Sequence, residues 1–248
     1  MNILQKDFKT LWRSSVIWLV LALLSFVLAW LFWQMLDRYI TLQGSFASLA
    51  NPPTITQAMW TPFVLMLAKL MMLMIAMTAG TSVAQERSQK TLWYLLINNS
   101  SPMHVIGAKF KVQLTLLLFV GIELLLVFAL LTVGGELNNL KVLISLIGLC
   151  LYCCWLMSLG MWISSQCQSP ATAVLLSLLV FVLVWMLGGQ TVNQEYGLNW
   201  LSLFSPAHHL QWFCEGQLAV SSLLYFIGGS VIFLRFSALQ IKQLRKLW

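Results

Sequence analysis

The chain has 248 residues, of which 60% are hydrophobic and only 8% are charged. Soluble globular domains contain about 45–50% apolar and about 25% charged residues. This composition excludes a soluble enzyme, a disordered chain and a nucleic-acid-binding module that carries a basic surface on a folded core. The sequence therefore predicts an all-α protein that crosses a membrane several times.

Six segments are apolar enough to span a membrane, which takes about 20 mostly apolar residues in a helix. They are residues 16–36, 60–82, 112–133, 142–163, 171–187 and 218–236. Charges within them are rare: Lys69 lies in the second segment, Glu123 in the third and Arg235 in the last turn of the sixth. We expect a single transmembrane domain over residues 1–248.

The basic residues are distributed unequally between the two sides of these segments. An even number of spans puts both ends of the chain on one side, and that side carries eleven of the 14 lysines and arginines. Two lie on the other side, and Lys69 lies within a span. Because basic loops tend to stay in the cytoplasm, we expect both termini to be cytoplasmic.

The segment 2–13, before the first span, has the pattern of an amphipathic helix. Leu4, Phe8 and Leu11 share one helical face, and the basic residues take the other faces. This arrangement predicts a helix that lies in the cytoplasmic membrane interface.

The outer segment 188–217 is too apolar for solvent and too interrupted to span a membrane. Tryptophans and leucines recur along it, and Pro206 breaks it in the middle. The segment therefore predicts two short interfacial or re-entrant helices, the second of which starts at Pro206.

The cytoplasmic segment 83–111 contains the start of a new helix. Ser101 can accept hydrogen bonds from the free amides of a first helical turn, and Pro102 fits that turn because no backbone donor is needed there. We therefore expect a helix that runs from Pro102 into the third span. Upstream, Leu92 and Trp93 make the segment more apolar than a solvated loop. This indicates contact with the membrane surface or a partner, and the alternative is an ordinary interhelical loop.

The sequence has no motif for a bound nucleotide, for zinc or for a nucleophilic serine. The patterns G-x-x-x-x-G-K-[ST], G-x-G-x-x-G, H-E-x-x-H and G-x-S-x-G are all absent. We therefore predict no catalytic residue, no metal site and no cofactor in this chain. Any energy that the protein uses must come from a partner.

Lys69 and Glu123 are charges within predicted spans, where an isolated charge is costly. At 1.5 Å per residue, both lie ~13 Å below the outer ends of two sequential, antiparallel helices. Their equal depth predicts a buried ion pair between the second and third spans. The alternative is that the two side chains line a substrate cavity.

Two segments resemble a known family. The first contains Glu86-Arg87-x-x-Lys90-Thr91-Leu92-x-x-Leu95-Leu96, then Ser101-Pro102, then Ile106-Gly107-Ala108-Lys109-Phe110. It resembles the E-R-x-x-G-T-L-E-x-L-L, S-P and I-x-G-K-F signature of type-2 ABC transporter permeases, with a lysine at position 90 where glycine is usual. The second, Ser205-Pro206-x-x-His209-Leu210-x-x-Phe213-x-x-Gly216, is similar to a segment of the gliding-motility permease subfamily.

The resemblance implies the permease subunit of an ABC exporter in a bacterial cytoplasmic (inner) membrane. Such a permease works as a dimer with a second copy or a related permease, contacts the lipid bilayer and does not bind nucleic acid. A separate cytoplasmic ABC ATPase, which binds ATP and Mg²⁺, docks on segment 83–111, so the permease itself is not an enzyme. The residues implied in this coupling are Glu86, Arg87, Thr91, Leu92, Trp93, Leu96, Ser101, Pro102 and Lys109. Those implied in the external re-entrant segment are Ser205, Pro206, His209, Phe213 and Gly216.

A second function stays open from the sequence. A membrane assembly or interaction protein without transport activity has the same apolar composition, and the two differ in whether an ATPase accompanies the chain. The apolar spans fit a lipid-like or amphipathic cargo, as they fit almost any exporter.

Overall fold

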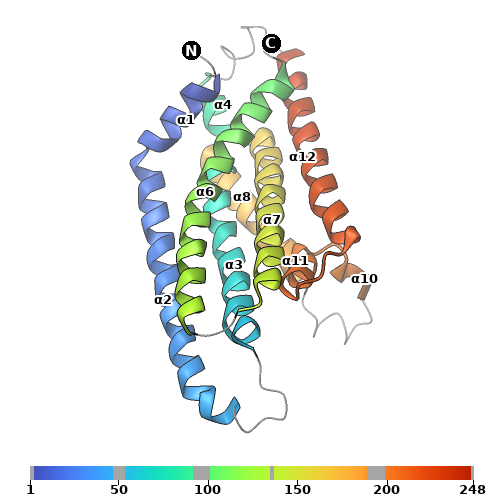
Figure 1. Cartoon of the computed structure of the whole chain (residues 1–248). Coiled ribbons are helices and arrows are strands. Elements are labelled where there is room, and N and C mark those ends of the chain that lie inside the picture. Colours follow the sequence, from blue (N-terminus) through green and yellow to red (C-terminus); the bar gives the residue numbers. More distant parts are fainter. Residues whose placement is uncertain (1–2, 47–53, 92–100, 135–136, 189–198, 247–248) are drawn as a thin grey trace.

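The computed structural model is a bundle of helices and describes residues 3–46, 54–91, 101–134, 137–188 and 199–246. The N-terminus and the C-terminus lie at the same end of the bundle (Figure 1). The elements, in chain order, are α1 (Ile3–Arg13), α2 (Ser15–Phe46), the π-helical turn η1 (Thr56–Trp60), α3 (Thr61–Thr78), α4 (Ala84–Ser88), α6 (Pro102–Gly134), α7 (Asn139–Gln166), α8 (Pro170–Met186), α10 (Asn199–Ser202), α11 (Pro206–Cys214) and α12 (Val220–Lys246).

Five helical segments are long and apolar enough to cross a membrane. They are Ser15–Leu42, Thr56–Thr78, Pro102–Val133, Asn139–Gln166 and Val220–Leu244. These segments confirm five of the six spans expected from the sequence. The remaining one, 171–187, corresponds to α8, which is apolar but has only 17 residues. A sixth span therefore stays a prediction.

Helix α7 is the centre of the bundle, and α3, α6, α8, α11 and α12 all pack against it (Figure 1). Asn138 caps its first turn by accepting a hydrogen bond from the Lys141 amide at 3.2 Å. Buried polar contacts then fix its neighbours: Trp60 Nε1 donates to Ser145 Oγ at 2.7 Å, and the Tyr152 hydroxyl donates to the Ala68 carbonyl at 3.2 Å. Helix α7 therefore holds η1 and α3 by hydrogen bonds as well as by apolar packing.

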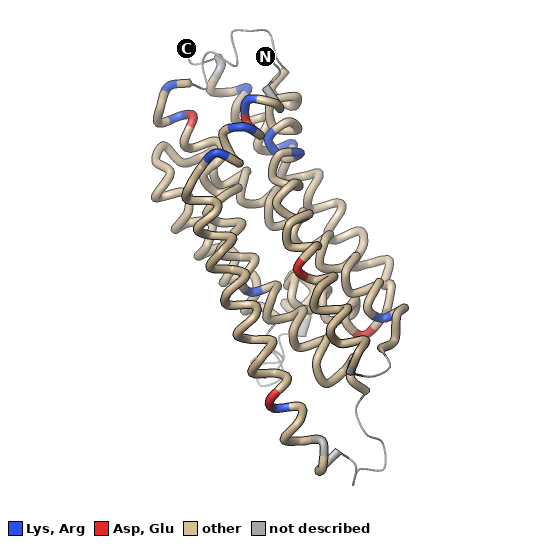
Figure 2. Tube along the Cα trace, turned by 60° about the vertical axis from the view of Figure 1, so that its left-hand side comes forward, with Lys and Arg blue, Asp and Glu red and all other residues tan. Residues whose placement is uncertain are grey.

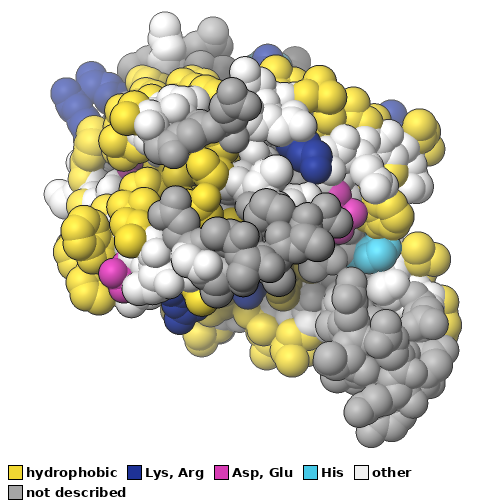
Figure 3. All heavy atoms as spheres, turned by 60° about the horizontal axis from the view of Figure 1, so that its bottom comes forward, with side chains coloured by type: hydrophobic (Ala, Val, Ile, Leu, Met, Phe, Trp, Pro, Cys, Tyr) yellow, Lys and Arg dark blue, Asp and Glu magenta, His cyan; other side chains and the backbone are white. Residues whose placement is uncertain are grey.

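Helices α2, α6 and α12 present rows of exposed apolar side chains on the outside of the bundle. Figure 3 looks toward the end opposite the termini, where hydrophobic side chains cover much of the surface among a few charged ones. An apolar surface of this extent is what a lipid environment requires. Most lysines and arginines gather at the other end, beside the two termini (Figure 2).

The described part of the outer segment 188–217 contains two short helices, α10 and α11, and α11 begins at Pro206 as expected. Helix α11 packs against α3, α7, α8 and α12. Whether these helices re-enter the membrane stays a prediction.

The expected ion pair between Lys69 and Glu123 is wrong. Among the described residues, no ion pair joins them. Glu123 accepts a hydrogen bond from the Ser25 hydroxyl of α2, whereas Lys69 is exposed on the surface of α3. The two residues have similar depths, but depth says nothing about the direction in which a side chain leaves its helix. The two side chains therefore lie in different surroundings, Glu123 against α2 and Lys69 on the exposed surface of α3.

Candidate functional site

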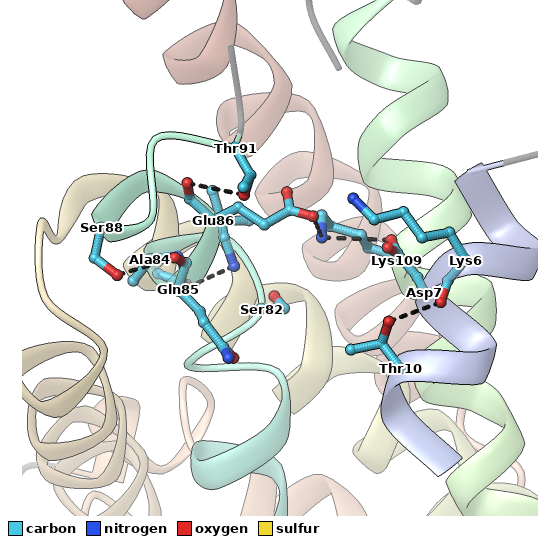
Figure 4. Close-up of polar contacts among 12 residues, drawn as sticks. Lys6, Asp7, Thr10, Ser82, Ala84, Gln85, Glu86, Ser88, Thr91 and Lys109 are labelled. Carbon is cyan, nitrogen blue, oxygen red and sulfur yellow. Dashed lines mark hydrogen bonds and ion pairs between the residues drawn. The ribbon is translucent and has the colours of Figure 1, made fainter. Parts of the chain in front are cut away.

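Three helices meet at a buried charge cluster near the end that holds the termini, and Lys109 of α6 is its centre. The Lys109 ammonium lies 2.9 Å from Glu86 Oε1 of α4 and 3.4 Å from Asp7 Oδ2 of α1 (Figure 4). Only 6% of Lys109 is exposed. A charge that has left water needs opposite charges at short range, and the two carboxylates supply them. The junction cluster Asp7–Lys109–Glu86 therefore joins α1, α4 and α6.

Asp7 was not among the residues predicted from the sequence. It is the one acidic residue in the basic amphipathic segment 2–13. An isolated acid among basic residues on a membrane-surface helix was the available signal, because it neither binds anionic lipid nor belongs to the apolar face. The structure shows that it points to Lys109 (Figure 4).

The aromatic side of α1 also contacts α6. Trp12 Nε1 donates to Thr115 Oγ1 of α6 at 3.3 Å, and Trp12 packs edge-on against Trp18 with ring centroids 5.4 Å apart. Leu11 and Trp12 are partly buried against the core, whereas Phe8 is 43% exposed. The predicted amphipathic helix is therefore present, and it packs on the protein with part of its apolar face.

Helix α4 is also fastened to the end of α7. Ser164 Oγ accepts hydrogen bonds from the backbone amides of Val83 at 3.1 Å and Ala84 at 3.0 Å, which satisfies two free donors at the start of α4. Arg87 Nη1 donates to the last carbonyls of α7, the shortest contact being 3.3 Å to Gln166. A cation at a helix C-terminus is favourable because free carbonyls point toward it.

Helix α4 ends in a left-handed residue, Lys90, with φ 57°. The Lys90 amide donates to the Arg87 carbonyl at 3.1 Å, and the Thr91 amide donates to the Glu86 carbonyl at 3.0 Å. This pair of bonds is the Schellman motif, whose left-handed position usually holds glycine. Lys90 stands at the position where the resembling permeases have glycine, so the structure explains that preference by backbone geometry.

Lys90→Gly is expected to stabilise the protein. A left-handed conformation costs a residue with a Cβ about 1–2 kcal/mol, and glycine removes this cost. The greater freedom of glycine in the unfolded chain opposes this stabilisation by about 0.5–1 kcal/mol. The midpoint of thermal unfolding in detergent should therefore rise by a few degrees, at about 2–4 °C per kcal/mol for a chain of this size. Gln89→Gly is the control, because Gln89 has φ −82° and gains nothing from glycine. Equal destabilisation by both substitutions would contradict the assignment.

Helix α6 starts where the sequence predicted. Ser101 Oγ accepts a hydrogen bond from the His104 amide at 3.2 Å, and Pro102 is the first helical residue. The helix then continues without interruption for 33 residues to Gly134. Thr91 is partly buried, and its hydroxyl donates to the Glu86 carbonyl at 3.3 Å. The other predicted coupling residues, Leu92, Trp93 and Leu96, lie outside the described residues.

A cavity of about 590 Å³ lies beside the junction cluster, between α1, α2, α3, α4, α6 and α8. Asp7, Glu86 and Lys109 line one part of it, and Leu11 and Met77 belong to its apolar lining. The hollow leaves α1 and α4 without close packing on this side.

The five residues predicted in the outer segment start α11, end it, or attach it to neighbouring helices. Ser205 Oγ accepts a hydrogen bond from the Ala207 amide at 3.2 Å, and Pro206 follows as the first helical residue. At the other end Gly216, with φ +85°, provides the left-handed residue of a second Schellman motif. Phe213 is fully buried and lies directly on Gly148 of α7.

His209 connects α11 to α12. The Leu203 carbonyl, which can only accept, lies 2.8 Å from Nε2, so Nε2 carries the proton and Nδ1 accepts from the Ser222 hydroxyl at 2.9 Å. The ring stacks on Tyr225 with centroids 4.3 Å apart. Burial lowers the pKa of His209 and the hydrogen bond to Leu203 opposes this, so the neutral form is favoured. In the described part of the chain no three His, Cys, Asp or Glu residues form a metal-binding group.

Residues 1–239 match the family described as ABC-2 family transporter protein, so the match covers nearly the whole chain. No curated protein matches the chain at a significant level.

Proposed function

The chain belongs to the ABC-2 transporter family and is a membrane permease subunit, and from this premise we propose that it exports cargo with energy from a separate ATPase. Permeases of this family work with ATPase subunits and are typically non-catalytic. In our proposal the ATPase binds ATP and Mg²⁺, docks on segment 83–111 and pushes on the permease when it closes.

The junction cluster is the observation that carries this proposal. Segment 83–111 contains α4 at one end and the first turns of α6 at the other, and the buried contact between Glu86 and Lys109 ties these two ends together. Asp7 adds α1 to the same cluster. A force that the ATPase exerts on segment 83–111 therefore acts on α1, α4 and α6 together, because the junction cluster connects them.

Helix α6 provides a route from this end of the protein to the other. At 1.5 Å per residue its 33 residues are ~50 Å long, longer than the ~30 Å hydrocarbon core of a membrane. Because Lys109 is the eighth residue of α6, near its start, a shift of the junction cluster tilts a rigid helix that reaches the opposite face. This supports coupling between the docking segment and a path through the membrane.

We further propose six spans, with α8 as the fifth, and both termini in the cytoplasm of a bacterium with this chain in its inner membrane. Lysines and arginines gather at the end that holds the termini, which supports that orientation (Figure 2). Helix α8 packs against α4 and α11, elements from opposite ends of the bundle, which supports a span in spite of its 17 residues. The similarity of the outer segment supports membership of the gliding-motility subfamily.

Trp93→Ala and Pro102→Ala are expected to reduce the amount of ATPase that co-purifies with the permease from its native membranes. Trp93 is an apolar residue in the proposed docking segment, and Pro102, in the same segment, is the first residue of α6. The measurement is vanadate-sensitive ATP hydrolysis in the purified complex, together with identification of a co-purifying protein that contains a P-loop.

Trp200→Ala is the matched control, since Trp200 is 58% exposed on α10, outside the proposed docking segment. It should leave the ATPase bound. Normal ATPase recovery with both docking-segment variants would remove the docking proposal. A complex that contains partner proteins but hydrolyses no ATP would favour the alternative of a membrane assembly protein.

A further inference from the structure

Lys69 lies in the middle of a membrane span. In the apolar segment Thr56–Thr78 it has 13 residues on one side and nine on the other, which is ~20 Å and ~14 Å of helix. Its side chain is exposed. Met66 and Leu73, 41% and 45% exposed, lie one turn away on either side and share its face of α3. We call Met66, Lys69 and Leu73 the α3 stripe.

Contact with lipid hydrocarbon is unfavourable for the α3 stripe because of the charge on Lys69. An ammonium group in hydrocarbon is costly, and lysines in spans face a protein interior or a water-filled cavity. The four-carbon stem of lysine lets the charge escape only near a helix end, and Lys69 is too far from both ends. The one carboxylate at similar depth, Glu123, is bound to Ser25 and its second oxygen is buried. Within the described chain, then, Lys69 has no counter-ion.

From this we propose that a second copy of the chain covers the α3 stripe, and that the two Lys69 side chains face a shared, water-filled space that receives an anionic group of the cargo. The inference rests on the proposed function, because it assigns a role in transport to Lys69.

Symmetry leads to the second copy. Two copies in one membrane have the same orientation, so their two-fold axis stands perpendicular to the membrane and a stripe near it meets the same stripe at the same depth. The apolar side chains Met66 and Leu73 then make contact above and below. The two Lys69 ammonium groups meet at one level, where two like charges at short range repel each other.

An anion between the two ammonium groups removes this repulsion. Carboxylate, phosphate and sulfate groups all have the required charge and accept hydrogen bonds from ammonium groups. The cargo class is therefore an amphiphile with an anionic group, and a cationic amphiphile is rejected by the same two charges.

The first experiment tests the position of the stripe. Lys69→Cys is introduced into a variant whose five native cysteines are replaced by alanine, and membranes are treated with a charged, water-soluble maleimide or with a short bis-maleimide. The thiol at position 69 should react with the first reagent and form a cross-linked dimer with the second. Leu118→Cys is the control, because Leu118 is 70% exposed near the middle of α6. Labelling and cross-linking no greater for Lys69→Cys than for Leu118→Cys would overturn the second copy and the water-filled space.

The second experiment tests the charge preference. The permease is reconstituted in phosphatidylcholine vesicles with a diazirine-bearing 16-carbon fatty acid or with the primary amine of the same chain, and labelled peptides are mapped by mass spectrometry. The fatty acid should label the α3 stripe severalfold more than the amine. Lys69→Arg should keep this preference and Lys69→Glu should reverse it. A preference that does not follow the charge at position 69 would overturn the anionic cargo class.

The two proposals fail separately. ATPase co-purification is measured on the wild-type protein from the same preparation. If no ATPase accompanies the permease while labelling follows the charge, then the energy source is wrong and the anion site stands. If the ATPase is present and labelling ignores the charge, then the anion site is wrong and the ATPase-driven permease stands.

Discussion

Lys109→Gln is expected to lower the thermal unfolding midpoint of the purified permease by roughly 6–20 °C. The substitution removes the ammonium that lies 2.9 Å from Glu86 and 3.4 Å from Asp7, and it leaves two largely buried carboxylates facing each other. Removing one partner of a buried pair costs about 3–5 kcal/mol. For a chain of this size each kcal/mol corresponds to about 2–4 °C. Intrinsic fluorescence during heating in detergent is the measurement.

Two further variants separate the loss of a counter-ion from a general effect of removing a lysine. Lys111→Gln, two residues later on α6 and exposed, should change the midpoint by only a degree or two, because surface charges contribute about 0–1 kcal/mol. The triple variant Asp7→Asn, Glu86→Gln, Lys109→Gln should recover most of the loss, since no charge is then left unpaired. The cluster is not a stabilising contact if Lys109→Gln and Lys111→Gln behave alike.

Gly148→Ala is expected to weaken the attachment of α11 to α7. A methyl group at position 148 would overlap the Cβ and ring of Phe213, whose side chain is fully buried. Overpacking of this kind costs about 1–3 kcal/mol, or roughly 2–12 °C in the unfolding midpoint. Limited proteolysis of α11 should accelerate in parallel, because α11 loses its contact with the central helix.

Gly121→Ala is the matched control for that substitution. Gly121 lies on α6, and a methyl group there would meet no atom within 4 Å. Alanine favours a helix over glycine by about 1 kcal/mol, so the midpoint should stay the same or rise. A fall of the same size for both variants would mean that loss of glycine, and not contact with Phe213, is responsible.

The features that depend on residues close together in the chain could be predicted from the sequence. The starts of α6 and α11 follow from a serine and a proline in succession, because capping depends on residues that are neighbours in the chain. The apolar spans follow from composition over a window of about 20 residues. Lys90 and Gly216 occupy left-handed positions. The resemblance to known permeases indicated that glycine is usual at both positions, but it did not indicate the backbone conformation.

Contacts between residues far apart in the chain could not be predicted from the sequence in this way. The depth of Lys69 follows from counting residues, but its azimuth around α3 depends on which helices pack there. Glu123 takes Ser25 as its partner, and a serine carries no charge that would single it out in advance. Asp7 and Lys109 meet only because α1 lies against α6, and nothing near either residue in the chain indicates the other.

The contact between α1 and α6 has a consequence for the order in which the protein is made. Trp12 and its partner Thr115 are 103 positions apart, and Asp7 and Lys109 are separated by a similar length of chain. At ~5–20 residues per second, the ribosome needs ~5–20 s to reach the second partner. Until then α1 has only α2 to pack against, through Trp12 and Trp18, so the rest of its apolar face must rest in the membrane interface. An amphipathic helix serves both stages, because the same face can rest in the membrane interface first and pack against α6 afterwards.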